Sequence, residues 1–191
     1  MSDEQAAMPP EQDEELRRIW DQAEHYPPVT TAEIRQMCKS PSAETRLLAL
    51  LLMRGEMGDG DPIDEFFDSA RDLIEDENNN CRWQALIVIG YFIDSRPEDV
   101  WRIIEQYGVS DDDDMRTGVG CVLLEHLLET HFERFFPALR EIILAGSTQM
   151  THTLTLCYMP YPREHRRMIR ELLTQVGEDH PMLREDRDES G

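Results

Sequence analysis

The sequence is almost without lysine, and this absence removes two kinds of chemistry. Lys39 is the only lysine among 191 residues, and 40 acidic residues against 19 lysines and arginines give a formal net charge of −21. A Schiff base and a Walker-type phosphate loop each need a suitably placed lysine, and Lys39 lies in neither context. The acidic balance also makes nucleic acid an unexpected partner, because binding to phosphates requires a basic footprint.

Long hydrophobic runs and paired cysteines are missing as well. The most apolar run, 85–93, is too short to span a bilayer, and the N-terminus lacks the basic and apolar segments of an export signal. The cysteines are scattered without a C-x-x-C pair, at Cys38, Cys81, Cys121 and Cys157. This spacing favours buried thiols over zinc or disulfide scaffolds, so we expect a cytoplasmic protein that does not bind membranes.

Residues for metal or nucleophilic chemistry do not gather in the sequence. His126 and His131 are five positions apart, and on one helix they would diverge by about 140°. Ser147 lacks the second glycine of a nucleophile elbow. The acidic runs 75–80 and 111–114 lack the central glycine and final glutamate of a calcium loop, so we expect them to cap helices. We therefore predict no catalytic residue, no cofactor and no metal site.

What the sequence does contain is a repeat. Arg46, Arg82 and Arg116 are 36 and 34 residues apart, and each precedes an apolar run, a spacing typical of helical repeats. A second pattern of apolar residues recurs at helical spacing. It comprises Ile63, Phe66, Phe67, Ala70, Leu73 and Ile74, then Val100, Ile103, Ile104 and Tyr107, and finally Phe132, Phe135, Phe136, Leu139, Ile142 and Ile143.

Over residues 29–146 the chain resembles the HEAT and armadillo-like family of helical repeats. The most specific match is Asp76, in a turn six residues before Arg82, because this pair forms hydrogen bonds within or between repeats of the family. Serines occupy the aspartate position before Arg46 and Arg116, which departs from the pattern. The resemblance implies antiparallel helix pairs stacked into a right-handed superhelix.

We accordingly predict an all-α fold, a right-handed α-solenoid of about three helix pairs with a capping helix at each end. The folded domain spans 12–177, between an acidic leader (1–11) and a charged tail (178–191) whose compositions predict disorder. Within it we place repeats at 29–58, 61–95 and 97–130, a degenerate repeat at 131–160 and the last capping helix at 162–177.

Analogy with such folds favours a non-catalytic module for protein–protein interaction. Solenoids bind partners through the face formed by successive second helices. The polar candidates on that face are Arg46, Arg54, Arg82, Gln84 and Arg116. Arg82 also has a competing structural role with Asp76.

Two charged surfaces offer further candidates. The segment 59–77 holds nine acids and only Arg71, and its outward side chains either bind a basic partner or form a solvated surface. The candidates there are Asp64, Glu65, Asp68 and Asp72. A basic stripe on the last helix consists of Arg163, Arg166, Arg167 and Arg170. It would pair with acids of the same chain, or with an acidic segment of a partner or of a second copy, and we favour the internal pairing or the pairing with a second copy, which would form a homodimer.

Two other functions remain open. An acidic inhibitor or immunity-type protein that neutralises a basic target such as a nuclease would suit the net charge. An enzyme on a helical-repeat scaffold is less favoured, because base-excision glycosylases need a basic groove for DNA.

Overall fold

The structure is a computed structural model that describes residues 10–58, 60, 62–158 and 161–178. The described residues form helices and turns and contain no β-strand, which confirms the all-α prediction. The chain divides into two compact units, Met1–Tyr91 (unit 1) and Phe92–Gly191 (unit 2), and each is considered by itself. This division falls inside the segment 61–95 that the sequence assigns to one repeat.

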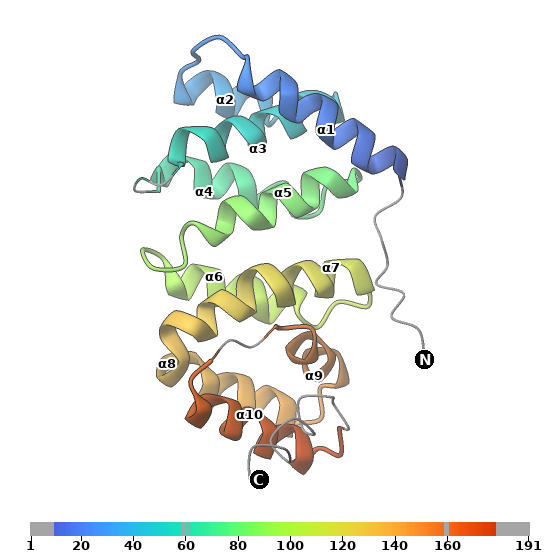
Figure 1. The fold of residues 1–191 in the computed structure, drawn as a ribbon, viewed down its shortest axis with the longest axis vertical. Helices are drawn as coiled ribbons and strands as arrows, with labels where there is room; N and C mark the ends of the chain where they lie inside the picture. The colour runs from blue at the N-terminus through green and yellow to red at the C-terminus, as the bar shows by residue number, and fades with distance from the viewer. Residues whose placement is uncertain (1–9, 59, 61, 159–160, 179–191) are drawn as a thin grey trace, which may run out of the picture. The chain divides into compact units, whose positions relative to one another are not determined.

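Unit 1 is built around one central helix. Its elements are α1 (Pro10–Glu24), α2 (Thr31–Met37), α3 (Ala43–Met57), α4 (Asp64–Arg71) and α5 (Asn79–Gly90) (Figure 1). Helix α3 packs against α1, α2 and α5, whereas α4 packs against α5 and α2. A helix covered on several sides must be apolar on several sides, which explains the nearly continuous hydrophobic sequence of α3.

Unit 2 also has a central segment. Its elements are α6 (Pro97–Tyr107), α7 (Asp113–Gly118), the π-helix η1 (Val119–Leu124), α8 (Glu125–Leu144), α9 (Thr148–Thr155) and α10 (Arg163–Gln175). The π-helix contacts α6, α7, α8 and α9. The backbone of α8 leaves helical geometry at His131, where φ is −130° and ψ is 34°. This break coincides with the predicted repeat boundary between 130 and 131.

Helices in both units begin with the same kind of cap. A short polar side chain accepts a backbone N–H two or three residues further on, at Ser42 for α3, Asn78 for α5, Asp112 for α7 and Ser147 for α9. Each such cap contributes on the order of 1 kcal/mol. Asn78 and Asp112 belong to the two polar runs that the sequence assigned to helix capping, so that prediction is confirmed.

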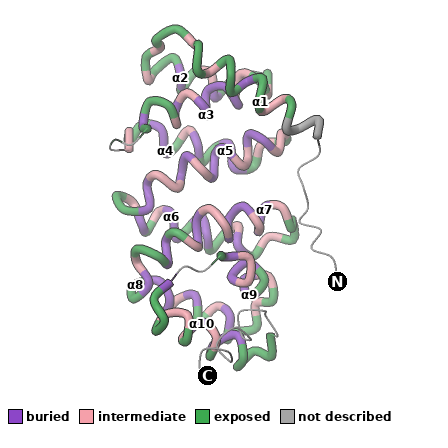
Figure 2. Tube along the Cα trace, viewed as in Figure 1, coloured by how far each residue is buried: buried purple, intermediate pink, exposed green. Residues whose placement is uncertain are grey.

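The predicted apolar stripes form much of the core (Figure 2). Most of the predicted side chains are at least 90% buried, including Phe67 in unit 1 and Phe136 in unit 2. The exceptions are Ile63, Tyr107 and Ile142, which are half-buried. Phe132 and Phe136 stack with ring centroids 4.5 Å apart. The helical period of these residues therefore identified the buried faces correctly.

The π-helix was not predicted, and it lies where α9 approaches closely. A Cβ at Gly120 would be only 2.7 Å from the Thr153 carbonyl oxygen and 3.2 Å from Leu156 Cβ, so this contact requires glycine. The Gly120 carbonyl accepts the Glu125 N–H in the widened turn, and also the Cys157 thiol at 3.3 Å. Nothing in the local sequence period signals this widened turn.

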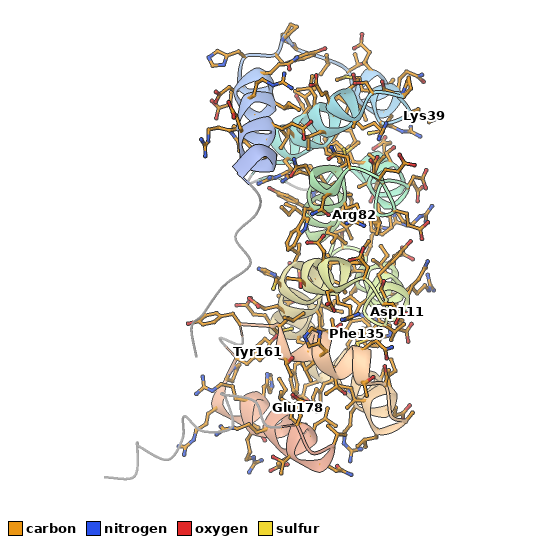
Figure 3. All side chains as sticks on the ribbon, turned by 90° about the vertical axis from the view of Figure 1, so that its right-hand side faces the viewer. Lys39, Arg82, Asp111, Phe135, Tyr161 and Glu178 are labelled. Carbon is orange, nitrogen blue, oxygen red and sulfur yellow. The ribbon has the colours of Figure 1, made fainter. Side chains whose placement is uncertain are left out.

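Helix α10 covers part of α8 within unit 2. The His165 ring stacks on Phe132 with centroids 3.8 Å apart, and the Tyr161 hydroxyl donates to the Glu125 carbonyl at 3.0 Å. Tyr161 is labelled in Figure 3. The apolar residues of α10 and its C-terminal neighbour are buried at Ile169, Leu172 and Leu173, half-buried at Met168 and exposed at Val176.

The predicted ends of the domain are described only in part. Helix α1 begins at Pro10, two residues before the predicted start of the folded domain. The remainder of the predicted leader lies outside the described residues, as does the tail after Glu178.

We predict that Phe67→Ala and Phe136→Ala each lower the free energy of unfolding by about 3 to 5 kcal/mol, because each leaves a cavity in a closely packed core. Chemical denaturation monitored by circular dichroism measures this loss. Val109→Ala is the control, since Val109 is 38% exposed, and it should cost about 0.5 kcal/mol or less. Losses below about 1 kcal/mol at both phenylalanines would contradict the assigned core.

Candidate functional site

Arg46 is a structural residue and not an open binding group. Its Nε and Nη2 donate to the Asp76 carboxylate at 2.5 and 2.8 Å, and its Nη1 donates to the Ser40 carbonyl at 2.9 Å. The Asp76 side chain is only 4% exposed. Burial alone would raise the pKa of Asp76, but hydrogen bonds from Arg46 and the Asn78 N–H hold it below its ordinary value.

Arg116 repeats part of this arrangement in unit 2. Its Nη1 donates to the Ser110 carbonyl six residues earlier, as Arg46 does to Ser40. It also pairs with Asp113, and its Nε lies 3.4 Å from His152 Nδ1. Only 8% of Arg116 is exposed, so it is not available as a partner-binding residue.

Arg82 is half-buried on α5 (Figure 3). Its Nε and Nη2 donate to the Asn79 side-chain oxygen at 3.1 and 2.6 Å. The sequence paired Arg82 with Asp76, whereas the bidentate partner of Asp76 is Arg46 on the preceding long helix. The family pattern thus located the buried carboxylate but not its main partner.

The predicted acidic surface is exposed along α4. Asp64, Glu65, Asp68 and Asp72 all face solvent, and Arg71 lies 3.2 Å from Asp68 and 3.9 Å from Asp72. The first two acids of the predicted segment, Asp59 and Asp61, lie outside the described residues. The exposed face of α4 therefore offers negative charge to a partner.

The four arginines of α10 differ in exposure. Arg163 and Arg167 are exposed, whereas Arg166 and Arg170 are half-buried. Arg166 Nη1 donates to the Tyr161 carbonyl at 3.0 Å. Arg167 lies between two acids of its own helix, 3.9 Å from Glu164 and 3.8 Å from Glu171. Part of this basic stripe is therefore neutralised within α10.

Arg54 and Gln84 are brought together by the structure. Arg54 Nη1 donates to the Gln84 side-chain oxygen at 2.5 Å, and the guanidinium carbon lies 4.8 Å from the centre of the Trp20 ring. The Trp20 indole N–H donates to Glu24 at 2.9 Å. A guanidinium stacked on tryptophan is held in place without a carboxylate, and such a contact contributes about 0.5 to 1 kcal/mol.

These residues border a surface groove of about 510 Å³ in unit 1, which we call the Arg54 groove. It is lined by the end of α1, the link to α2, the end of α3 and the residue after α5. The lining residues are Trp20, Ala23, Glu24, Tyr26, Pro27, Pro28, Val29, Leu51, Leu52, Arg54, Gly55, Glu56 and Tyr91. Its volume lies in the range of protein ligand sites, and three aromatic residues take part in its walls.

The electrostatics of the groove are unusual for this acidic chain. Among the described residues no carboxylate pairs with Arg54, and its buried Nε has no hydrogen-bond partner. Leaving such a donor unsatisfied costs about 1 to 3 kcal/mol. Glu24 and Glu56 lie on the same walls and are exposed. The groove therefore presents aromatic and prolyl surface and two negative charges, beside an arginine whose Nη1 is bound to Gln84 and whose Nε is buried.

The thiols of unit 1 are not activated for catalysis. Burial raises the pKa of Cys38 to about 11 and that of Cys81 to about 12, so both remain protonated at neutral pH. In unit 2, burial also raises the pKa of Cys121 and Cys157. Within the described residues, His, Cys, Asp and Glu form no cluster of three that could hold a metal ion. No helix in this part of the chain combines the length and apolar character needed to cross a membrane.

Sequence reasoning missed most of the groove. It singled out Arg54 and Gln84 but not the aromatic residues Trp20, Tyr26 and Tyr91. Tyr26 precedes Pro27 and Pro28 in the link between α1 and α2. An aromatic residue beside two prolines in a link was the one available signal, because Tyr91 joins the groove only through the packing of α3 on α5.

Comparison with known proteins does not assign the chain to a family. The chain matches no protein-family model, no curated protein and no solved structure.

We predict that Asp76→Asn lowers the free energy of unfolding by about 3 kcal/mol at neutral pH, because it leaves Arg46 without its buried partner. Asp68→Asn is the control and should cost about 0.5 kcal/mol, since its pair with Arg71 is exposed. The pKa of Asp76 is lowered on folding, so its stabilisation is present above about pH 4 and is lost as the pH falls through the folded pKa.

Denaturant titrations of the wild type and Asp76→Asn at several pH values measure both effects. The difference between the two proteins should shrink below about pH 4. A difference under about 1 kcal/mol at neutral pH, or one that persists unchanged to about pH 2, would contradict the structural role of this pair.

Proposed function

We propose that the chain is a non-catalytic protein-binding module and that the Arg54 groove is its binding surface. The observation that carries this proposal is the state of Arg54. Its guanidinium is held by Trp20 and Gln84, and its Nη2 has no hydrogen-bond partner among the described residues that line this aromatic groove. A positioned donor beside apolar walls suits recognition of a peptide segment, whose backbone supplies carbonyl acceptors.

We also propose that the helices form a HEAT-like solenoid. Arg46 and Arg54 on α3 contact Asp76 and Gln84, and both contacts span 30 residues. Equal separations at two points along α3 support a parallel packing of the two helices, as expected for second helices of successive repeats. The shared bond of Arg46 and Arg116 to the carbonyl six residues earlier supports repetition in both units.

The four unpaired cysteines support a reducing compartment such as the cytoplasm as the place of action.

A second candidate function is neutralisation of a basic target by the exposed acids of α4. Four exposed carboxylates on one short helix could steer a basic protein, as in an inhibitor or immunity-type protein. The arginines of α10 could meet the same acids on another copy of the chain. Binding of either kind would depend on Asp64, Glu65, Asp68 and Asp72 and would weaken strongly as salt rises.

Selection from a random peptide library tests the primary proposal. Full-length protein is immobilised beside two variants, one with Trp20→Ala and Arg54→Gln, and a control with Asp68→Asn and Asp72→Asn. We expect peptides that bind the wild type and the control, and that bind the groove variant at least about tenfold more weakly. Thermal unfolding confirms that both variants are folded.

Two outcomes would contradict the proposal. Peptides that bind the groove variant as well as the wild type would place recognition elsewhere, and loss of binding only in the α4 variant would favour the acidic inhibitor. Failure to enrich any peptide on the wild type over the groove variant would also reject the groove as a binding surface.

A further inference from the structure

We propose that the occupant of the Arg54 groove is a proline-rich segment of a partner protein, in polyproline II conformation and with a basic residue next to its prolines. This inference rests on the proposed function and specifies its ligand. It combines three properties of the groove, namely its aromatic walls, the Nη2 donor of Arg54, and an acidic rim formed by Glu24 and Glu56.

The walls of the groove suit prolyl rings. Trp20, Tyr26 and Tyr91 are partly exposed on three different segments of unit 1, and the rings of Pro27 and Pro28 add rigid apolar surface beside them. Polyproline II peptides dock on such aromatic walls, and they lose little conformational freedom because the free peptide is already extended.

The remaining donor of Arg54, Nη2, favours an extended backbone over a helix. A polyproline II segment has no internal hydrogen bonds, so every carbonyl along it needs a donor. Arg54 uses Nη1 for Gln84 and its Nε is buried, so the group left to donate to a peptide carbonyl is Nη2, which has no hydrogen-bond partner among the described residues. A helical ligand satisfies its own carbonyls along its length and would leave this donor unpaired.

The charge of the rim favours a basic neighbour. Glu24 accepts the Trp20 indole N–H through one carboxylate oxygen, and the other remains able to accept from a lysine or arginine. Glu56 adds a second exposed carboxylate to the lining of the groove. An acidic ligand would gain Arg54 but would face these two carboxylates and a chain of net charge −21. Long-range attraction therefore selects a basic segment.

Fluorescence anisotropy with labelled synthetic peptides tests the inference on the full-length protein. The probe is a ten-residue peptide with two prolines in P-x-x-P spacing and two arginines at one end. One matched peptide replaces the prolines with alanine, and the other replaces the arginines with glutamate. We expect each replacement to weaken binding at least about tenfold. Binding of the original peptide, which carries both prolines and arginines, should weaken markedly as salt rises.

Charge-matched variants separate the rim from the general acidity of the chain. Glu24→Gln with Glu56→Gln removes the same charge as Asp68→Asn with Asp72→Asn, and all four residues are exposed. The rim variant should bind the arginine peptide at least about fivefold more weakly than the α4 variant does. Equal losses in the two variants would show unspecific attraction and overturn the inference.

The inference and the proposed function can fail separately. If the library selection yields groove-dependent peptides that contain neither prolines nor basic residues, the groove remains a binding surface but our assignment of its occupant is wrong. Groove-dependent binding of an acidic or helical peptide would have the same meaning. If the proline-rich probe binds the wild type and the Trp20→Ala, Arg54→Gln variant equally, the inference is rejected.

Discussion

The bond between Arg46 and Asp76 is the interaction on which the rest of unit 1 depends. It joins α3 to the turn before α5 with two parallel hydrogen bonds to a carboxylate that is almost fully buried. Such a pair tolerates only one register, because a shift would leave a buried charge without a partner. Eight residues further along α3, the same register brings Arg54 to Gln84. The geometry of the groove thus follows from a structural ion pair outside it.

Much of the helical fold could be predicted from the sequence, because it depends on local patterns. The period of Phe66, Phe67 and Ala70 identified a buried helix face, and Asn78 and Asp112 marked helix starts through a side-chain bond to nearby N–H groups. The π-helix at Val119–Leu124 was beyond such patterns, since it accompanies the close approach of the Thr153 backbone to Gly120.

The candidate site was predicted less well, for a related reason. An arginine looks the same in a sequence whether it is bound internally or open to a ligand. Arg46 and Arg116 are held by neighbouring carbonyl and carboxylate oxygens, whereas Arg54 stacks on a tryptophan and pairs with no acid among the described residues. That difference arises because α1 packs on α3 and places Trp20 against Arg54. Aromatic residues from α1, a link and the end of α5 become one surface only after packing.

The most direct test of the groove as a binding surface is nuclear magnetic resonance of the tryptophan indoles during addition of the proline-rich, arginine-flanked peptide. The chain has three tryptophans, and only Trp20 lines the groove. We expect the indole N–H signal of Trp20 to shift progressively with peptide while that of Trp101, which is buried in unit 2, stays unchanged. An unchanged Trp20 signal at saturating peptide, or equal shifts of the Trp20 and Trp101 signals, would contradict binding in the Arg54 groove.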